Sequence, residues 1–255
     1  MSIISEERSS DSPYIETVMR GWTVSNGSTI RPAEINWHMV FAKHNGSVHP
    51  LVVGPLTTAG IAAWGEGAEI LWIKFKLGAF MPHLPTKDNL NTETSLPDAS
   101  SKSFWLKGAV HQFPNYDNIE TFVDRLVRED VLVHDPVVNA ALGDQLPEMS
   151  SRTVRHRFLR ATGLTQSHIR QFERAQRAEA LLRQGVSILD TVFEAGYFDQ
   201  PHLTRSLKQF IGHTPAQIIR DSMLEDCHSV QDSLLLSGYD TNVLTNISLM
   251  PKEKE

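Results

Sequence analysis

The feature of this sequence that most constrains its fold is a change in hydrophobic period near Asp117. Before that residue, apolar and polar side chains alternate, which is the two-residue period of a half-buried strand. After it, apolar residues recur every three or four positions, as they do on one face of an α-helix. The 255 residues are therefore expected to form an α+β, multidomain chain in which a β-rich part precedes an all-α part.

The alternating part predicts antiparallel strands at residues 35–42, 48–53 and 70–77. The dipeptide Asn45-Gly46 lies between the first two and is typical of a two-residue hairpin turn, because both positions tolerate a positive φ. We therefore expect an antiparallel β barrel or jelly-roll-like domain.

The limits of that domain follow from composition. Residues 1–20 are polar and are expected to be loosely held, and residues 82–103, rich in Pro, Asn, Thr and Ser, are expected to form a long loop. A helical period over residues 117–130, with Asp117 and Glu120 in a capping-box spacing, predicts a terminal helix. The β-rich domain is therefore expected to span residues 21–133.

Residues 134–220 are expected to form short helices that include two helix-turn-helix passages. Four side chains that can cap a helix each precede an apolar-periodic stretch, namely Ser150, Thr165, Ser187 and Asp199. Glycines at the ends of these stretches supply stops. Residues 221–255 are acidic with no sustained period, so they are expected to be an irregular tail.

The charge is distributed unevenly along the chain. The net charge is −6, but residues 151–220 carry 11 Lys and Arg against 5 Asp and Glu, a net +6, and ten of the 11 are arginines. A guanidinium group can form paired hydrogen bonds with a phosphate or with a guanine edge, so this block is compatible with nucleic-acid binding. A solvated helical surface explains the charge of the block equally well.

The helices that begin after Ser150 and Asp199 share one layout. Each has an apolar back, formed by Val154 and Phe158 in the first, and a polar front near its N-terminal end. An α-helix fits the major groove of B-DNA, and residues near its N-terminus reach the base edges. Side chains suited to that role are Arg152, Arg155 and His156 in the first helix, and Gln200, His202, Thr204 and Arg205 in the second.

Residues 196–218, with the sequence GYFDQPHLTRSLKQFIGHTPAQI, and the helices before them resemble the AraC/XylS family of bacterial transcription regulators. The resemblance covers about residues 136–220. It implies a seven-helix domain in which two helix-turn-helix units, joined by one linker helix, enter successive major grooves of double-stranded DNA. By position it assigns base reading to Arg152, Arg155, His156, Gln200, Pro201, His202, Thr204 and Arg205.

The sequence departs from the family pattern at three positions. Glu148 stands where the family usually has glycine before the first recognition helix. Asp144 and Val192 stand where a small alanine usually packs the bracing helix of each unit. These departures leave open whether the first helix-turn-helix unit is regular, and the added volume of Val192 is expected to loosen the second slightly.

The resemblance implies that the β-rich domain is a cupin-like sensor or dimerisation domain. Aromatic side chains there are candidates for a ligand cavity, although an ordinary core accounts for them as well. They are Trp37, Phe41, Trp64, Trp72 and Phe75. No metal or cofactor is expected, because the histidines include no His-x-His pair; they are His38, His44, His49, His83 and His111. Cys227 is the single cysteine, which excludes an internal disulfide.

Together these features predict a cytoplasmic, non-enzymatic regulator that binds promoter DNA and acts as an activator. A small-molecule effector, RNA polymerase and a second copy of the chain are the expected partners. No apolar run reaches the roughly 18–20 residues that span a membrane. Two alternatives stay open: a cupin-type, metal-dependent enzyme with a vestigial helical module, and a protein-interaction role in which DNA binding has been lost.

Overall fold

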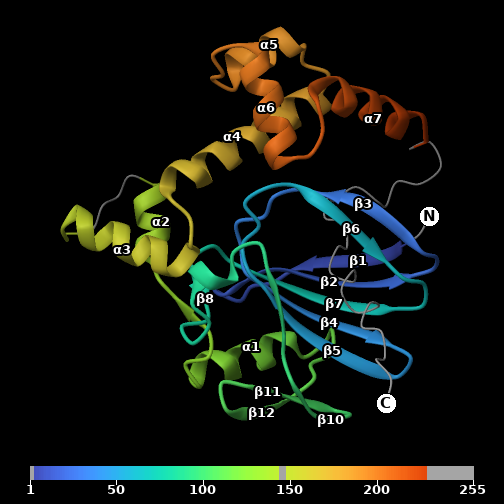
Figure 1. Cartoon of the computed structure of the whole chain (residues 1–255), viewed down its shortest axis with the longest axis vertical. Coiled ribbons are helices and arrows are strands. Elements are labelled where there is room, and N and C mark those ends of the chain that lie inside the picture. The colour runs from blue at the N-terminus through green and yellow to red at the C-terminus, as the bar shows by residue number, and fades with distance from the viewer. Residues whose placement is uncertain (1–2, 144–147, 229–255) are drawn as a thin grey trace, which may run out of the picture.

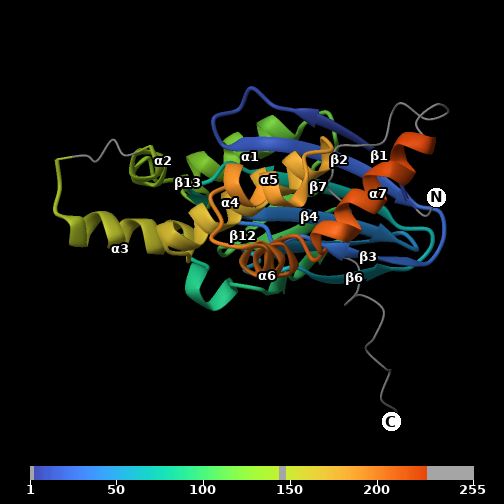
Figure 2. The ribbon, with the colours of Figure 1, turned by 90° about the horizontal axis from the view of Figure 1, so that it is seen from above.

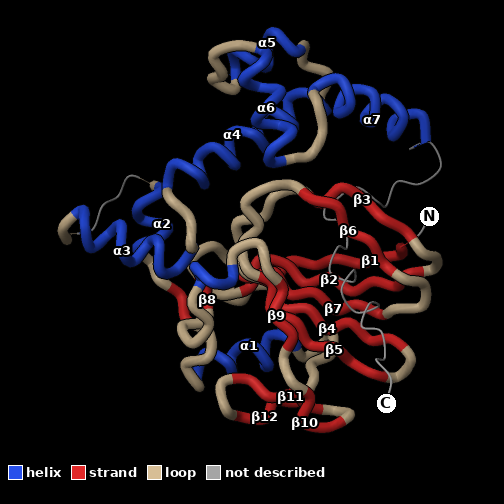
Figure 3. Tube along the Cα trace, viewed as in Figure 1, coloured by secondary structure: helices blue, strands red, loops and turns tan. Residues whose placement is uncertain are grey.

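A computed structural model describes residues 3–143 and 148–228, and shows a β-rich N-terminal region beneath a helical C-terminal region (Figures 1 and 3). The strands are β1 Ile3–Ser9, β2 Ile15–Thr23, β3 Gly27–Arg31, β4 His38–His44, β5 Ser47–Val53, β6 Gly60–Trp64, β7 Glu69–Phe75, β8 Ala79–Phe80, β9 Glu93–Ser95, β10 Asp98–Ser100, β11 Ser103–Leu106, β12 Ala109–Gln112 and β13 Val133–His134. The helices are the 3₁₀ helix η1 Thr86–Asn89, and α1 Ile119–Arg128, α2 Val137–Leu142, α3 Ser151–Thr162, α4 Gln166–Arg183, α5 Ile188–Glu194, α6 Gln200–Phe210 and α7 Pro215–His228.

The main sheet has six antiparallel strands in the order β1-β2-β7-β4-β5-β9. Smaller antiparallel sheets are formed by β3 with β6, by β10 to β12, and by β8 with β13. The expected hairpin at Asn45-Gly46 is confirmed, with φ angles of 50° and 80° at the two turn residues between β4 and β5. The N-terminal region is therefore the β-rich domain that the alternating pattern predicts.

The two faces of the main sheet are covered by different elements. On one face, Phe41 contacts Phe122 of α1, with ring centres 5.9 Å apart. On the other face, Val40 and Ile70 belong to a separate apolar cluster with Trp64 of β6. The strand period of two explains the division, because neighbouring residues of β4 point to opposite faces. The sheet therefore lies between α1 and the two-stranded sheet of β3 and β6 (Figure 1).

The first twenty residues contain ordered strands, in contrast to the loosely held segment that their polarity suggests. β1 pairs with β2 over its whole length. Arg8 donates hydrogen bonds to both carboxylate oxygens of Glu120 on α1, at 2.6 and 3.0 Å. Backbone pairing does not depend on side-chain polarity, and the partner residue lies 112 positions away, so composition gives no sign of either contact.

Two further segments differ from their expected form. Residues 82–103 contain η1, β9 and β10 in place of one long loop, and β9 completes the main sheet beside β5. The helix expected at 117–130 is observed as Ile119–Arg128, and its N-cap is Asn118, which makes no side-chain capping bond. Glu120 does not close a capping box there, because its carboxylate is bound by Arg8 and Ser10.

The helical region is built around α4. Its apolar stripe, which includes Ile169 and Phe172, packs against α6, and α2 packs on α3. One continuous apolar core extends from the sheet face under α1 into these helices. α7 extends to His228, eight residues past the point where the helical pattern was expected to end at Arg220. Asp144 and residues 229–255 lie outside the described residues.

The β-rich domain contacts the C-terminal ends of α3 and α6. The backbone N–H of Ala33 donates to the carbonyl oxygen of Phe210 at 2.6 Å, and that of Ala59 donates to Gln209 at 2.7 Å. The Thr86 hydroxyl donates to the carbonyl oxygen of Arg160 at 2.8 Å. Carbonyl groups in the last turn of a helix lack partners within the helix, so these bonds from outside stabilise both ends.

Candidate nucleic-acid interface

The N-terminal end of α3 is formed by a helix cap and faces solvent. The Ser150 side chain accepts a hydrogen bond from the backbone N–H of Thr153 at 3.2 Å, as the sequence predicts. Val154 and Phe158 are buried behind it. At the other end, Gly163 has a φ of +68°, the left-handed conformation that ends helices. α3 therefore has the expected apolar back and a polar, exposed front.

The N-terminal end of α6 is capped in the same way. The Asp199 carboxylate accepts a hydrogen bond from the backbone N–H of His202 at 2.7 Å. Leu203 and Leu207 are fully buried, and Phe210 packs edge-on against Phe172 of α4. Thr165 and Ser187 cap α4 and α5 as the sequence predicts. All four predicted N-caps are thus confirmed.

His168 of α4 serves the packing beneath α6. Its ring lies edge-on to Phe210, with ring centres 5.3 Å apart. Burial lowers the pKa of His168, which favours the neutral imidazole at neutral pH. This histidine is therefore a packing residue that braces α6.

The candidate base-reading residues lie on the exposed sides of the two helix tips. All eight are at least partly accessible to solvent, six of them are exposed, and the sequence predicted all eight at these tips. The exposed ones are Arg152, Arg155, His156, Gln200, Pro201 and Arg205, and the partly exposed ones are His202 and Thr204. His202 lies edge-on to Tyr197, with ring centres 5.1 Å apart. The structure brings these residues together as two separate groups, one on each helix.

The arginines at the two tips have no acidic partner within residues 3–143 and 148–228. No ion pair or side-chain hydrogen bond is formed by Arg152, Arg155 or Arg205 in that part of the chain. By contrast, Arg157 on α3 is bound by both carboxylate oxygens of Asp135, at 2.9 and 2.7 Å. Arg157 therefore anchors α3, whereas the arginines at the tips keep their donors available for a ligand.

The polar side of α4, which the sequence-based prediction did not include, carries the further arginines Arg170 and Arg174. A hollow of about 540 Å³ is lined by Gln166, Ser167, Arg170, Gln171 and Arg174. Arg174 donates to the carbonyl oxygen of Gly196 at 3.3 Å and lies over the Tyr197 ring, 5.0 Å from its centre. Arg174 thus fixes the turn before α6. The spacing of four between Arg170 and Arg174 could have indicated this polar face from the sequence, because it places both arginines on one side of the helix.

The two candidate recognition helices point in different directions. Figure 2 shows α6 end-on while α3 lies across the view, with α4 connecting them. With 18 residues, α4 is about 27 Å long at 1.5 Å per residue. A duplex that contacts both tips must therefore bend, or α3 must turn relative to α6.

The aromatic residues considered for an effector cavity are divided between the two faces of the sheet. Trp37, Phe41 and Phe75 are buried in the core on the α1 face. Trp64, in β6, and Trp72 belong to the apolar cluster on the opposite face. The structure does not bring these residues into one group, because the strand period separates Phe41 and Phe75 from Trp72.

A cluster of charged groups, in which Lys74 and Glu34 are largely buried and Glu16 is partly exposed, lies beside Trp72. Lys74 forms ion pairs of 3.1 Å with Glu16 and with Glu34, and the Trp72 indole donates to Nδ1 of His38. Burial, followed by the charge of Lys74, lowers the pKa of His38 well below its usual range. Burial also raises the pKa of Glu34, although Lys74 opposes that shift. The strand register places Lys74, Trp72 and His38 on the same face of the sheet.

Metal-ligand clusters and membrane-spanning helices are both absent from residues 3–143 and 148–228. No group of three or more His, Cys, Asp or Glu side chains there is arranged to hold a metal ion. No helix in the same residues has both the length and the apolar character needed to cross a bilayer. The side chain of Cys227 is not among those described.

Comparison with known proteins identifies the helical region. Residues 147–221, just under a third of the chain, match the family described as a helix-turn-helix domain. No curated protein and no solved structure matches the chain. The matched residues begin beside the Ser150 cap and end in α7, so they contain α3 to α6 and both arginine-bearing tips. The C-terminal helical region therefore contains an AraC-type helix-turn-helix domain, which supports an AraC/XylS-family regulator.

Proposed function

We propose that this protein is a sequence-specific, DNA-binding transcription activator that contacts promoter DNA through two helix-turn-helix units. The first unit is α2 with α3, and the second is α5 with α6. The observation that carries the proposal is the pair of capped helix tips with exposed arginines that have no acidic partner among the described residues. The matched helix-turn-helix domain supports it independently.

The chemistry of the tips fits base and phosphate recognition. Arginine binds guanine O6 and N7 through two hydrogen bonds, and glutamine binds adenine in a similar way. Arg205 and Gln200 are exposed within the first six residues of α6, where a helix in the major groove reaches the bases. Arg152 and Arg155 hold the equivalent places on α3. Residues 134–220 form the DNA-binding domain in this proposal.

The experiment begins by selecting bound fragments from genomic DNA with the full-length protein. Fluorescence anisotropy then measures the affinity for a selected fragment at several salt concentrations. Because each neutralised phosphate releases counterions, log K should fall linearly with log[salt], with a slope of about −0.9 per phosphate contact. Binding that does not depend on salt, or no binding to any fragment, would overturn the proposal.

The activator role requires a contact with RNA polymerase. α5 and the turn after it expose three apolar side chains, with Leu189 73%, Phe193 87% and Phe198 91% accessible. Leu189 and Phe193 are four residues apart on one side of α5, so they form an exposed apolar patch of the kind that marks an interaction site. A Phe193→Ala, Phe198→Ala double variant should bind promoter DNA normally but fail to stimulate transcription by purified polymerase. Normal stimulation by that variant contradicts this contact.

The β-rich domain is assigned two roles in this proposal, effector response and dimerisation. The polar cluster beside Trp72, with His38 and Lys74, lies on the side of the sheet that faces β6 and supports a cupin-like sensing role. β1 is an edge strand of the main sheet, so it has backbone groups available for pairing with a second copy. No observation on the described residues favours the enzyme alternative.

A further inference from the structure

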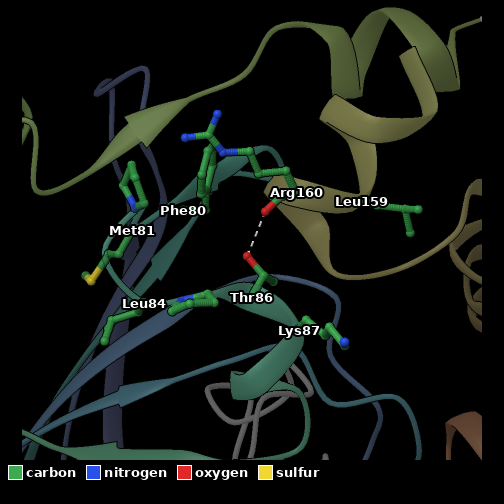
Figure 4. Close-up of a pocket in the computed structure, with 9 residues that line it drawn as sticks. Phe80, Met81, Leu84, Thr86, Lys87, Leu159 and Arg160 are labelled. Atoms are coloured by element: carbon green, nitrogen blue, oxygen red, sulfur yellow. Dashed lines mark hydrogen bonds between the residues drawn. The ribbon is translucent and has the colours of Figure 1, made fainter. Parts of the chain in front are cut away.

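A cavity of about 250 Å³ lies where the β-rich domain meets α3 (Figure 4). Its apolar walls include Phe80 and Leu84 from the β-rich side and Leu159 from α3. The hydrogen bond from Thr86 to the Arg160 carbonyl oxygen lies in the same wall. A molecule in this cavity would therefore contact both regions of the protein at once.

The edge of the cavity carries two positive charges. Lys87 and Arg160 line it and are exposed, and their charged ends point in different directions (Figure 4). The Arg160 guanidinium lies 5.9 Å from the centre of the Phe80 ring. In the part of the chain that the structure describes, neither cation forms an ion pair with an acidic side chain. Both can therefore bind an anionic group from a ligand.

We propose that this cavity binds a small carboxylic acid with an apolar chain. This inference rests on the proposed function, for which it supplies an effector class and a site. The Arg160 guanidinium holds the carboxylate, Lys87 provides the second positive charge, and the apolar chain packs on Phe80, Leu84 and Leu159. Each molecule in liquid water occupies about 30 Å³. The cavity of about 250 Å³ therefore has room for about eight groups of that size, and hexanoate has that number of non-hydrogen atoms.

A ligand bound in the cavity fixes the orientation of α3 relative to the β-rich domain. The ligand needs Arg160 and Leu159 of α3 in place against η1, so it binds only when α3 is docked on the β-rich domain. By linkage, it stabilises that docked arrangement. The tip of α3 bears Arg152 and Arg155, and α3 is not parallel to α6 (Figure 2). A ligand that fixes α3 therefore raises or lowers the affinity of the protein for DNA that contacts both tips.

Calorimetric titration of the full-length protein, without DNA, tests the site directly. The probes are hexanoate, its neutral amide hexanamide, acetate and inorganic phosphate. We expect saturable binding of hexanoate, and at least tenfold weaker binding of the other three, because each lacks either the charge or the apolar chain. Equal binding of hexanoate and hexanamide, or of hexanoate and phosphate, would overturn the proposal, as would no binding of hexanoate.

Single-residue variants test the roles of Arg160 and Lys87 in hexanoate binding. Arg160→Ala and Lys87→Ala should each weaken hexanoate binding, the first by at least tenfold, and Arg160→Lys should recover part of the loss. Arg128→Ala is the matched control, since Arg128 is also an exposed arginine in the last turn of a helix. Its hexanoate affinity should equal that of the wild type. Equal affinity in the Arg160→Ala variant would overturn the assignment of the carboxylate to that residue.

A final titration separates this inference from the proposed function. Saturating hexanoate should change the DNA affinity at least fivefold, and saturating DNA should change the hexanoate affinity by the same factor. If hexanoate binds and the DNA affinity does not change, the regulatory part is wrong. If the protein binds no DNA at all, the proposed function fails while the calorimetric result on the site still stands.

Discussion

The hydroxyl of Thr86 donates a 2.8 Å hydrogen bond to the backbone carbonyl oxygen of Arg160 and joins η1 to the last turn of α3. The bond from Ala33 to Phe210 performs the same task at the end of α6. Both helices that carry candidate DNA-reading residues are therefore held at their C-terminal ends by the β-rich domain. Their N-terminal tips stay accessible.

Replacing Thr86 with valine removes this hydrogen bond and keeps the shape of the side chain. The Arg160 carbonyl group then loses its partner, and we expect the free energy of unfolding to fall by about 0.5–1.5 kcal/mol. Urea denaturation followed by circular dichroism measures the change. Thr86→Ser keeps the hydroxyl and should retain most of the stability, whereas an equal loss in both variants contradicts the role of the hydrogen bond.

Gly212 should tolerate alanine less well than Gly185. Both have a positive φ, +89° and +84°. A Cβ at Gly212 would lie 2.3 Å from Cγ2 of Ile30, whereas a Cβ at Gly185 meets no atom within 4 Å. Gly185→Ala therefore measures the backbone strain alone, about 1–2 kcal/mol, and Gly212→Ala adds the clash with the β-rich domain. Equal losses in thermal or urea unfolding would show that the two regions separate there without cost.

Replacing Arg205 with alanine should weaken binding to the preferred DNA site by ~1–3 kcal/mol if its guanidinium reads a base. Competition anisotropy with preferred and scrambled duplexes measures the loss for each. Lys208→Ala, at the opposite end of the same helix, is the control and should leave the preference between the duplexes unchanged. A similar loss on both duplexes for Arg205→Ala would make this arginine a phosphate contact.

Acid should destabilise the contact between β1 and α1. The hydrogen bonds from Arg8, and then from Ser10, lower the pKa of Glu120 from 4.5 to about 2 in the folded chain. The carboxylate therefore stabilises the fold above about pH 4.5, and this contribution is lost as the pH falls toward 2. Glu120→Gln should make the unfolding free energy less dependent on pH across that range.

A second glutamate provides the control for this pH experiment. Glu66 is exposed, and its carboxylate forms no ion pair within residues 3–143 and 148–228. Glu66→Gln should keep the pH dependence of the wild type. The interpretation fails if Glu120→Gln keeps it too, because the Arg8 ion pair would then contribute nothing measurable.

The positions of the helix caps and the hairpin turn could be predicted from the sequence. A cap such as Ser150 or Asp199 bonds to a backbone group three residues away, and the turn at Asn45-Gly46 depends on the φ angles of its own residues. These interactions are local, so residue identity and spacing are sufficient to indicate them. The candidate tips of α3 and α6 were predictable for the same reason.

The sequence by itself therefore determined the order and type of most elements and the residues at the two helix tips. Only the tertiary structure decided that Arg8 meets Glu120, that Trp72 faces away from Phe41 and Phe75, and that Thr86 and Ala33 hold the ends of α3 and α6. Such contacts join groups far apart in the chain, and several use backbone atoms that every residue possesses. Their existence depends on how the whole chain packs, and no local pattern of side chains encodes that.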